Sequence, residues 1–146
     1  MKALVIYDSV YGNTEKIAQA VGSALGGEGK VVRVSEANPL SVDAFDMVII
    51  GSPTLGGRPS EPVQNFLAAL SETAVKDKKI AAFDTRYSGK FVKLFGYAAD
   101  RIAESLTAKG GKLVSPPQPF IVTGKKGPLK DGELEKAVDW AKDISK

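Results

Sequence analysis

The chain has 146 residues, of which 43% are hydrophobic and 25% charged, a composition typical of one globular domain spanning residues 1–146. It contains no cysteine and no histidine, which excludes disulfides, thiolate nucleophiles, Cys/His zinc sites and histidine-dependent catalytic triads. The net charge is +3, but the basic residues are dispersed and no nucleic-acid-binding motif accompanies them, so we expect no nucleic-acid partner. Any chemistry is therefore expected to come from a bound cofactor.

The basic residues are concentrated in the second half of the chain. Residues 1–73 carry 5 basic and 8 acidic side chains, whereas residues 74–146 carry 15 and 9. Arg86, Lys90 and Lys93 lie in a stretch without any acid. Such a surplus is most simply interpreted as a solvated face.

No part of the sequence has the features of a targeting or membrane segment. The first apolar run, residues 3–7, is too short for a secretory signal, and no later run is long enough to cross a bilayer. We therefore expect a cytoplasmic protein without membrane contact.

In chain order, short apolar runs alternate with segments of helical periodicity. Four strands are predicted at residues 3–7, 31–34, 47–50 and 80–83, and four helices over residues 14–25, 63–70, 91–109 and 131–144. A fifth strand over 113–122 is interrupted by the prolines of residues 115–119, which places it at a sheet edge. In the last helix we expect four side chains to be buried, and we interpret the single tryptophan as a packing residue: Leu134, Ala137, Val138 and Ala141, with Trp140.

This alternation predicts an α/β fold. Right-handed crossovers between parallel strands place helices on both faces of the sheet, which gives a three-layer αβα sandwich around a five-stranded parallel sheet. In open sheets of this kind, ligands bind beyond the carboxyl ends of the strands. Functional residues are therefore expected in the loops after the first, third and fourth strands.

The loop after the first strand is rich in small hydrogen-bond donors and contains no lysine or arginine. Its residues are Ser9, Val10, Tyr11, Gly12, Asn13 and Thr14. At the start of a helix, free N–H groups and these side chains can hold a phosphate dianion without a cation. The alternative is that Asn13 or Thr14 caps the helix, with Glu15 in its first turn.

The stretch from Ser9 to Thr14 resembles the phosphate loop of the flavodoxin family, which has a hydroxyl-x-hydroxyl-Gly-Asn-Thr pattern after its first strand. It matches neither the GxxxxGK[ST] loop of ATPases nor the GxGxxG loop of dinucleotide-binding folds. The resemblance implies that the chain binds flavin mononucleotide (FMN) and has the strand order 2-1-3-4-5. Because the fifth strand contains no long insertion, the chain is similar to the short-chain members of that family.

The segment Gly51–Pro59, after the third strand, is dense in glycine and proline, and by itself it indicates a turn. By resemblance it is the loop that meets the flavin ring, through Pro53, Thr54, Leu55, Gly56 and Gly57. The two glycines are the candidates for a peptide that reorients on reduction. No tryptophan lies in this segment, so Leu55 is expected to cover one flavin face or to leave it open.

The third loop, residues 84–89, contributes Asp84, Thr85, Arg86 and Tyr87 to the expected site. The resemblance implies that Tyr87 stacks on the flavin, although exposed tyrosines are common in loops. Arg86 is expected near the pyrimidine end of the ring, where a cation would favour the reduced anion and raise the last potential.

The function implied by the resemblance is that of an FMN-dependent carrier passing single electrons between redox partner proteins, as a monomer or weak oligomer. Its basic flank favours an acidic partner or a phosphorylated reductant. The alternative is a flavodoxin-like NAD(P)H-dependent quinone or FMN reductase. A cofactor-free signalling receiver ranks last, because such modules need an aspartate where this chain has the sequence Ile50-Gly51-Ser52.

Overall fold

The computed structural model describes residues 1–27, 29–87 and 97–146. Its strands all run parallel in one sheet: β1 (Ala3–Tyr7), β2 (Gly29–Arg33), β3 (Met47–Pro53), β4 (Lys79–Tyr87), β5 (Lys112–Leu113) and β6 (Gln118–Val122). The helices are α1 (Asn13–Ala24), α2 (Glu61–Ala69), α3 (Ala98–Ala108) and α4 (Glu133–Ile144), with two short 3₁₀ helices, η1 (Val34–Glu36) and η2 (Pro39–Ala44).

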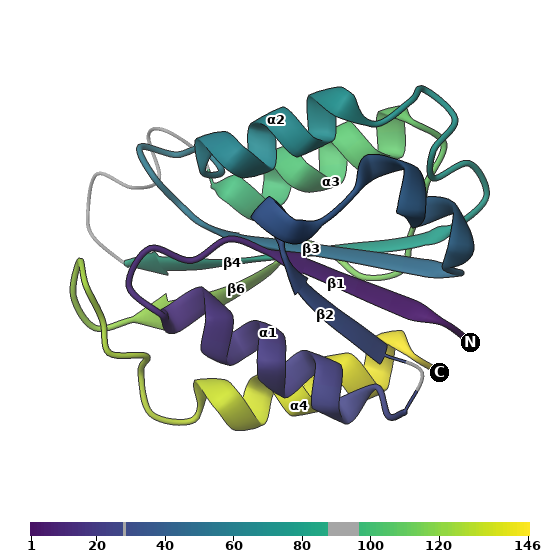
Figure 1. Cartoon of the computed structure of the whole chain (residues 1–146). Helices are drawn as coiled ribbons and strands as arrows, with labels where there is room; N and C mark the ends of the chain where they lie inside the picture. The colour runs from purple at the N-terminus through teal and green to yellow at the C-terminus, as the bar shows by residue number, and fades with distance from the viewer. Residues whose placement is uncertain (28, 88–96) are drawn as a thin grey trace.

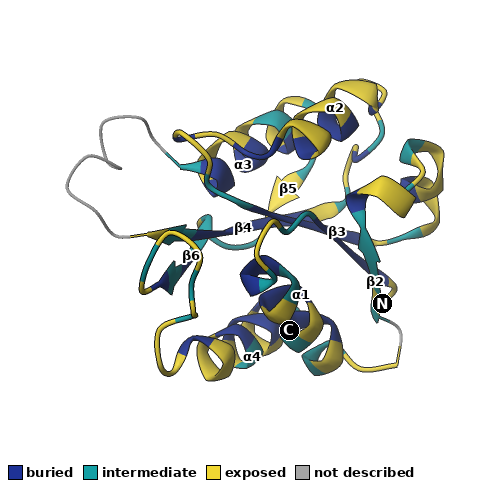
Figure 2. Cartoon of the chain, turned by 60° about the vertical axis from the view of Figure 1, so that its left-hand side comes forward, coloured by how far each residue is buried: buried dark blue, intermediate teal, exposed yellow. Residues whose placement is uncertain are grey.

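The sheet lies between two layers of helices, with α1 and α4 on one face and α2 and α3 on the other (Figure 1). Alternation along β1 shows why: Leu4 and Ile6 pack in the core under α2 and α3, whereas Val5 and Tyr7 pack against α1 and α4. Each inner face is buried and each outer helical face is exposed (Figure 2). The predicted three-layer sandwich is confirmed.

The strand order is β2-β1-β3-β4-β5, with β6 also paired to β4, so the predicted order 2-1-3-4-5 is confirmed. The fifth strand is split into β5 and β6, as the prolines at residues 116 and 117 indicate. Both halves pair with β4 alone among the described strands, which agrees with the predicted edge position. The break is tied down by Trp140, whose Nε1 donates to Ser115 Oγ at 3.1 Å.

The tryptophan is a packing residue, as predicted. The rings of Trp140, Phe83 and Phe120 meet edge to face in all three pairs, with centroids 5.9 to 6.1 Å apart. Such pairs add about 0.5–1.5 kcal/mol each to the burial of their area. This cluster fixes α4 against β4 and β6.

The extents of three predicted elements need correction, those of β3, β4 and α3. Strands β3 and β4 extend further than predicted, so Gly51–Pro53 and Asp84–Tyr87 are strand residues rather than loop. Helix α3 begins at Ala98, because Tyr97 is extended with φ −139° and ψ 149°, and the expected inward positions Phe91 and Phe95 lie outside the described residues.

In α4 the burial of one predicted core residue is wrong. Leu134 is 42% exposed, and Val138 is half-buried, while Ala137 and Ala141 are buried as expected. Leu134 instead lines a shallow groove between α4 and α1. Within the described ranges, no helix has both the length and the apolar character needed to cross a bilayer.

Candidate functional site

A pocket of about 380 Å³ lies at the carboxyl edge of the sheet, where β1, β3 and β4 end and α1 begins. Its walls come from four separate segments and consist of Val10, Tyr11, Asn13, Thr14, Pro53, Thr54, Leu55, Gly56, Thr85, Arg86, Tyr87, Val122 and Lys125. The structure thus brings together the three predicted segments. Of the predicted site residues, four are not among the lining residues: Ser9, Gly12, Gly57 and Asp84.

The start of α1 is uncapped by any side chain. Gly12 occupies the N-cap position in the left-handed region, with φ +93°, and offers no side-chain acceptor. The first helical bond is Lys16 N to Gly12 O, so in the described chain the N–H groups of Asn13, Thr14 and Glu15 have no acceptor. Asn13 and Thr14 are buried helical residues, so the alternative in which they cap the helix is wrong. Three free N–H groups at a helix start form a site for an anion.

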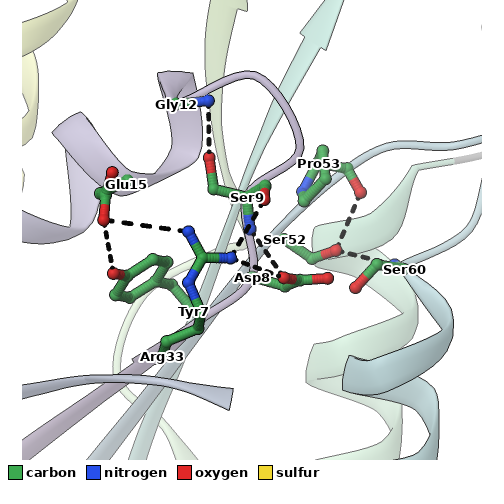
Figure 3. Close-up of polar contacts among 9 residues, drawn as sticks. All are labelled: Tyr7, Asp8, Ser9, Gly12, Glu15, Arg33, Ser52, Pro53 and Ser60. Atoms are coloured by element: carbon green, nitrogen blue, oxygen red, sulfur yellow. Dashed lines mark hydrogen bonds and ion pairs between the residues drawn. The ribbon is translucent and has the colours of Figure 1, made fainter. Parts of the chain in front are cut away.

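The loop before α1 is held by its own side chains (Figure 3). Ser9 Oγ accepts from the Gly12 N–H at 3.0 Å, and Asp8 Oδ1 accepts from the Ser9 N–H at 2.9 Å. Because the Ser9 hydroxyl is an acceptor there, its own proton is free to be donated elsewhere. Ser9 therefore shapes the loop from behind and retains one donor.

Arg33, from β2, braces this loop. Its NH1 donates to Asp8 Oδ1 at 3.2 Å and to the Ser9 carbonyl at 3.1 Å, and its NH2 lies 3.9 Å from Glu15 (Figure 3). Tyr7 donates its hydroxyl to Glu15 at 2.8 Å, and its pKa is raised above 10.0, first by burial and then by that carboxylate. The Arg33 charge is shared between two carboxylates.

A fourth segment, the loop after β6, closes one end of the pocket. The Asn13 side-chain amide donates to the Lys126 carbonyl at 3.1 Å. Gly127, with φ +103°, lies so close that a Cβ there would stand 2.6 Å from Asn13 Nδ2. The next residue of α1 contacts β4, because the Thr14 and Thr85 hydroxyls are 2.7 Å apart. The start of α1 is thereby locked to both β4 and the β6 loop.

The segment after β3 forms a tight two-glycine turn. Leu55 and Arg58 exchange both backbone hydrogen bonds, at 2.8 and 3.1 Å, while Gly56 and Gly57 have φ of +59° and +81°. Two positive φ angles define a type I′ turn, which explains the Gly-Gly pair. Arg101 Nε fixes the Gly57 carbonyl at 3.0 Å. That contact does not involve the peptide between the two glycines, whose reorientation on flavin reduction remains a prediction.

At the end of β4 a buried carboxylate holds a pocket-lining arginine. Asp84 is fully buried, accepts from Arg86 Nε and NH2 at 2.8 and 2.7 Å, and accepts from the Ala99 N–H at 2.9 Å. Burial raises the pKa of Asp84, opposed by Arg86 and by the Ala99 N–H. The Arg86 guanidinium also lies 3.4 Å from the centroid of the Tyr97 ring. Arg86 thus faces the pocket with its charge paired, and its effect on flavin potentials remains a prediction.

The rim of the pocket is apolar and exposed. Val10, Tyr11, Leu55 and Tyr87 are between 44% and 53% exposed, although all are large hydrophobic or aromatic side chains. A flat aromatic ligand would cover such side chains, while its anionic group would meet the free N–H groups of α1. The residues present therefore fit a phosphorylated flavin.

Two lining residues, Val122 and Lys125, were not predicted. Both come from the end of β6 and the turn after it. The available signal was the Gly-Lys-Lys-Gly sequence of residues 124–127 directly after a strand, since turns at the carboxyl ends of strands form the ligand-binding edge.

The chain is similar to several flavoproteins. It is 31% identical over 121 residues to "Putative diflavin flavoprotein A 4" of Synechocystis sp., covering 70% of this chain and 20% of that protein. It is 27% identical over 154 residues to a flavodoxin of Maridesulfovibrio salexigens, covering 99% and 97%. It is 30% identical over 139 residues to an NAD(P)H dehydrogenase (quinone) of Methylocella silvestris, covering 75% and 70%. The chain thus spans only a fifth of the length of the diflavin relative.

The fold has close counterparts among solved structures. An archaeal flavodoxin superposes with a TM-score of 0.84 at 23% identity, covering 99% of this chain and 96% of the other. The Flavodoxin family model matches residues 5–140, which include every segment of the pocket. The chain therefore belongs to the flavodoxin family, whose members bind FMN.

Proposed function

We propose that the chain is an electron carrier that binds FMN in the pocket at the carboxyl edge of the sheet and exchanges electrons with redox partner proteins. The observation that carries this proposal is the start of α1, where the N–H groups of Asn13, Thr14 and Glu15 have no acceptor in the described chain and open beside an apolar rim. Bound FMN supplies the electron-transfer chemistry, and the protein supplies binding and orientation.

Each segment of the pocket has a distinct role in this proposal. Residues 9–14 hold the phosphate through N–H and hydroxyl donors, each charge-assisted bond contributing about 1.5–3 kcal/mol. Leu55 and Tyr87 cover the two faces of the ring, and the turn at Gly56 and Gly57 meets its edge. Leu55 and Tyr87 lie at the rim of the pocket, so this placement puts the ring at the protein surface, within reach of a partner protein.

The partners are proposed to be a reductase and an electron acceptor whose docking surfaces are acidic. The support is the excess of basic side chains in residues 74–146. Lys90 and Lys93, on which this expectation partly rests, lie outside the described residues.

A second candidate is an NAD(P)H-dependent quinone or FMN reductase. The similarity to the Methylocella silvestris quinone dehydrogenase favours it, since that relative is matched over 75% of this chain.

Stepwise anaerobic reduction of the FMN-loaded protein, followed by its visible spectrum, tests the proposal. We expect the flavin bands to bleach through two separate one-electron stages and no steady-state oxidation of NADPH with a quinone. Rapid quinone-dependent NADPH oxidation would instead establish the reductase. A protein that takes up no flavin would contradict both.

A further inference from the structure

We propose that Lys125 supplies the positive charge for the ligand phosphate that the loop of residues 9–14 lacks, and that it makes the pocket prefer FMN to unphosphorylated riboflavin. This inference rests on the proposed function and deepens it, because it assigns a specificity residue outside the three expected segments.

Lys125 is the pocket-lining cation that has no acidic partner among the described residues. Two basic side chains line the pocket, Arg86 and Lys125, and no acidic side chain of the described residues does. Arg86 is bound by the buried Asp84 carboxylate through two hydrogen bonds. Lys125 has no ion pair within the described part of the chain, and its side chain is exposed. Its charge is therefore available to a ligand.

The backbone places Lys125 at the phosphate end of the pocket. Residues 124–127 form a β-turn closed by the Gly127 N–H donating to the Gly124 carbonyl at 3.0 Å, with Lys125 and Lys126 at its two central positions. The carbonyl of Lys126 accepts from the side chain of Asn13, the first residue of α1. Lys125 thus comes from a turn that touches the segment whose N–H groups are free.

The acidic side chains around the phosphate loop explain why a further positive charge would strengthen phosphate binding. Asp8 and Glu15 both lie beside the phosphate loop, whereas Arg33 is the one cation bound to them in the described structure. Two carboxylates against one guanidinium leave a net negative charge next to the place where a dianion would sit. A lysine on the pocket side offsets that repulsion by attracting the phosphate, because solvent screens the interaction between two charges in the pocket only partly.

Lys126 provides a matched control. It is the neighbouring residue in the same turn, it is exposed, and its side chain does not line the pocket. Its bond to Asn13 uses the backbone carbonyl, so substitution of the side chain keeps that bond. Any effect of overall charge, or of the turn, should appear equally in variants at both positions.

The experiment is a fluorescence-quenching titration of the wild type, Lys125→Gln, Lys125→Arg and Lys126→Gln with FMN and, separately, with riboflavin. We expect Lys125→Gln to weaken FMN binding about three- to tenfold, the range for a partly solvated ion pair, and to change riboflavin binding less than about twofold. Added salt should reduce the difference in FMN affinity between the wild type and Lys125→Gln. Lys125→Arg and Lys126→Gln should both bind FMN as tightly as the wild type.

Equal losses for FMN and riboflavin, equal losses in both lysine variants, or no loss at all would overturn the assignment of Lys125. Each of those results would leave the proposed function intact, provided that the wild type binds FMN. A wild type that binds neither flavin would overturn the proposed function itself. Circular dichroism of each variant confirms that the compared proteins are folded.

Discussion

The carboxylate of Asp84 holds the guanidinium of Arg86 through two hydrogen bonds of 2.8 and 2.7 Å, at the point where β4 reaches the pocket. The two residues are two positions apart in one strand, so their side chains point to the same face. Asp84 is fully buried, and its pKa is raised by that burial, although Arg86 opposes the shift. This pair therefore couples stability to pH.

Arg86→Met is expected to destabilise the protein by about 3–5 kcal/mol near neutral pH, because it leaves a buried carboxylate without its partner. Because the pKa of Asp84 is raised in the folded protein, folding favours the protonated carboxyl. The contribution of Asp84 to the stability of the fold therefore falls as the pH rises from the ordinary value near 3.8 through the folded-state pKa. Removing Arg86 raises that folded value further. The deficit should therefore grow as the pH rises above the ordinary carboxyl value of 3.8, measured by urea unfolding.

Arg58→Met is the control for that experiment, since the Arg58 side chain is exposed. We expect it to be nearly neutral at every pH. A deficit in Arg86→Met that stays constant across the pH range would show that the lost interaction is packing on Tyr97 rather than the ion pair.

Gly12→Ala tests the left-handed start of α1. Gly12 has φ +93°, and a Cβ added there would meet no atom of the described chain within 4 Å beyond its own sequence neighbours. The substitution therefore adds backbone strain of about 1–2 kcal/mol without a clash. Relief of that strain moves the N–H groups of the loop, and we expect FMN binding to weaken at least about tenfold. Isothermal titration calorimetry and thermal unfolding measure the two effects.

Gly26→Ala is the matched control, because Gly26 has φ +85° and equally open surroundings at the other end of α1. It should cost similar stability and leave FMN affinity unchanged. If both variants lost FMN affinity alike, general destabilisation would explain the result.

Arg33→Met tests the brace of the phosphate loop. The variant leaves the carboxylates of Asp8 and Glu15 uncompensated beside the ligand phosphate, so FMN binding should weaken about three- to tenfold and riboflavin binding much less. Titrations at about 50 and about 500 mM salt should show a smaller effect at the higher ionic strength. Lys112→Met, which removes an exposed ion pair with Asp77, should have no effect on either flavin.

Tyr87→Ala and Leu55→Ala test the apolar rim. Because these side chains are proposed to cover the ring and not the phosphate, each substitution should weaken FMN and riboflavin by the same factor, about three- to tenfold. Leu40→Ala, at a side chain 85% exposed on η2, should change neither affinity. A selective loss of FMN binding in Tyr87→Ala would contradict the proposed placement of the ring.

The parts of the fold predicted from the sequence were those in which local pattern and tertiary packing agree. Apolar runs such as residues 47–50 and the Gly-Asn-Thr start of α1 are decided locally, and the order of the strands followed from a resemblance carried by Ser9–Thr14. The beginning of α3 at Ala98 was not predicted, because apolar spacing continues on its N-terminal side. Extended Tyr97 instead lies under Arg86, a contact set by tertiary structure.

The same distinction applies to the site. Residues directly following strands were identified by position, including those that prove to be strand ends at Thr85 and Tyr87. Lys125 was missed because it follows a broken edge strand that was treated as structural, and its proximity to Asn13 depends on a contact between residues far apart in the sequence. The pairing of Asp84 with Arg86 was also missed, because that segment was interpreted as a loop.

The central claim is that the start of α1 binds the phosphate of FMN, and a ¹H–¹⁵N correlation spectrum recorded during FMN titration tests it most directly. The account predicts saturable binding with the largest downfield shifts at the N–H groups of Asn13, Thr14 and Glu15, and riboflavin should leave these groups nearly unshifted. Absence of binding, or FMN-induced shifts that spare these three residues, would contradict it.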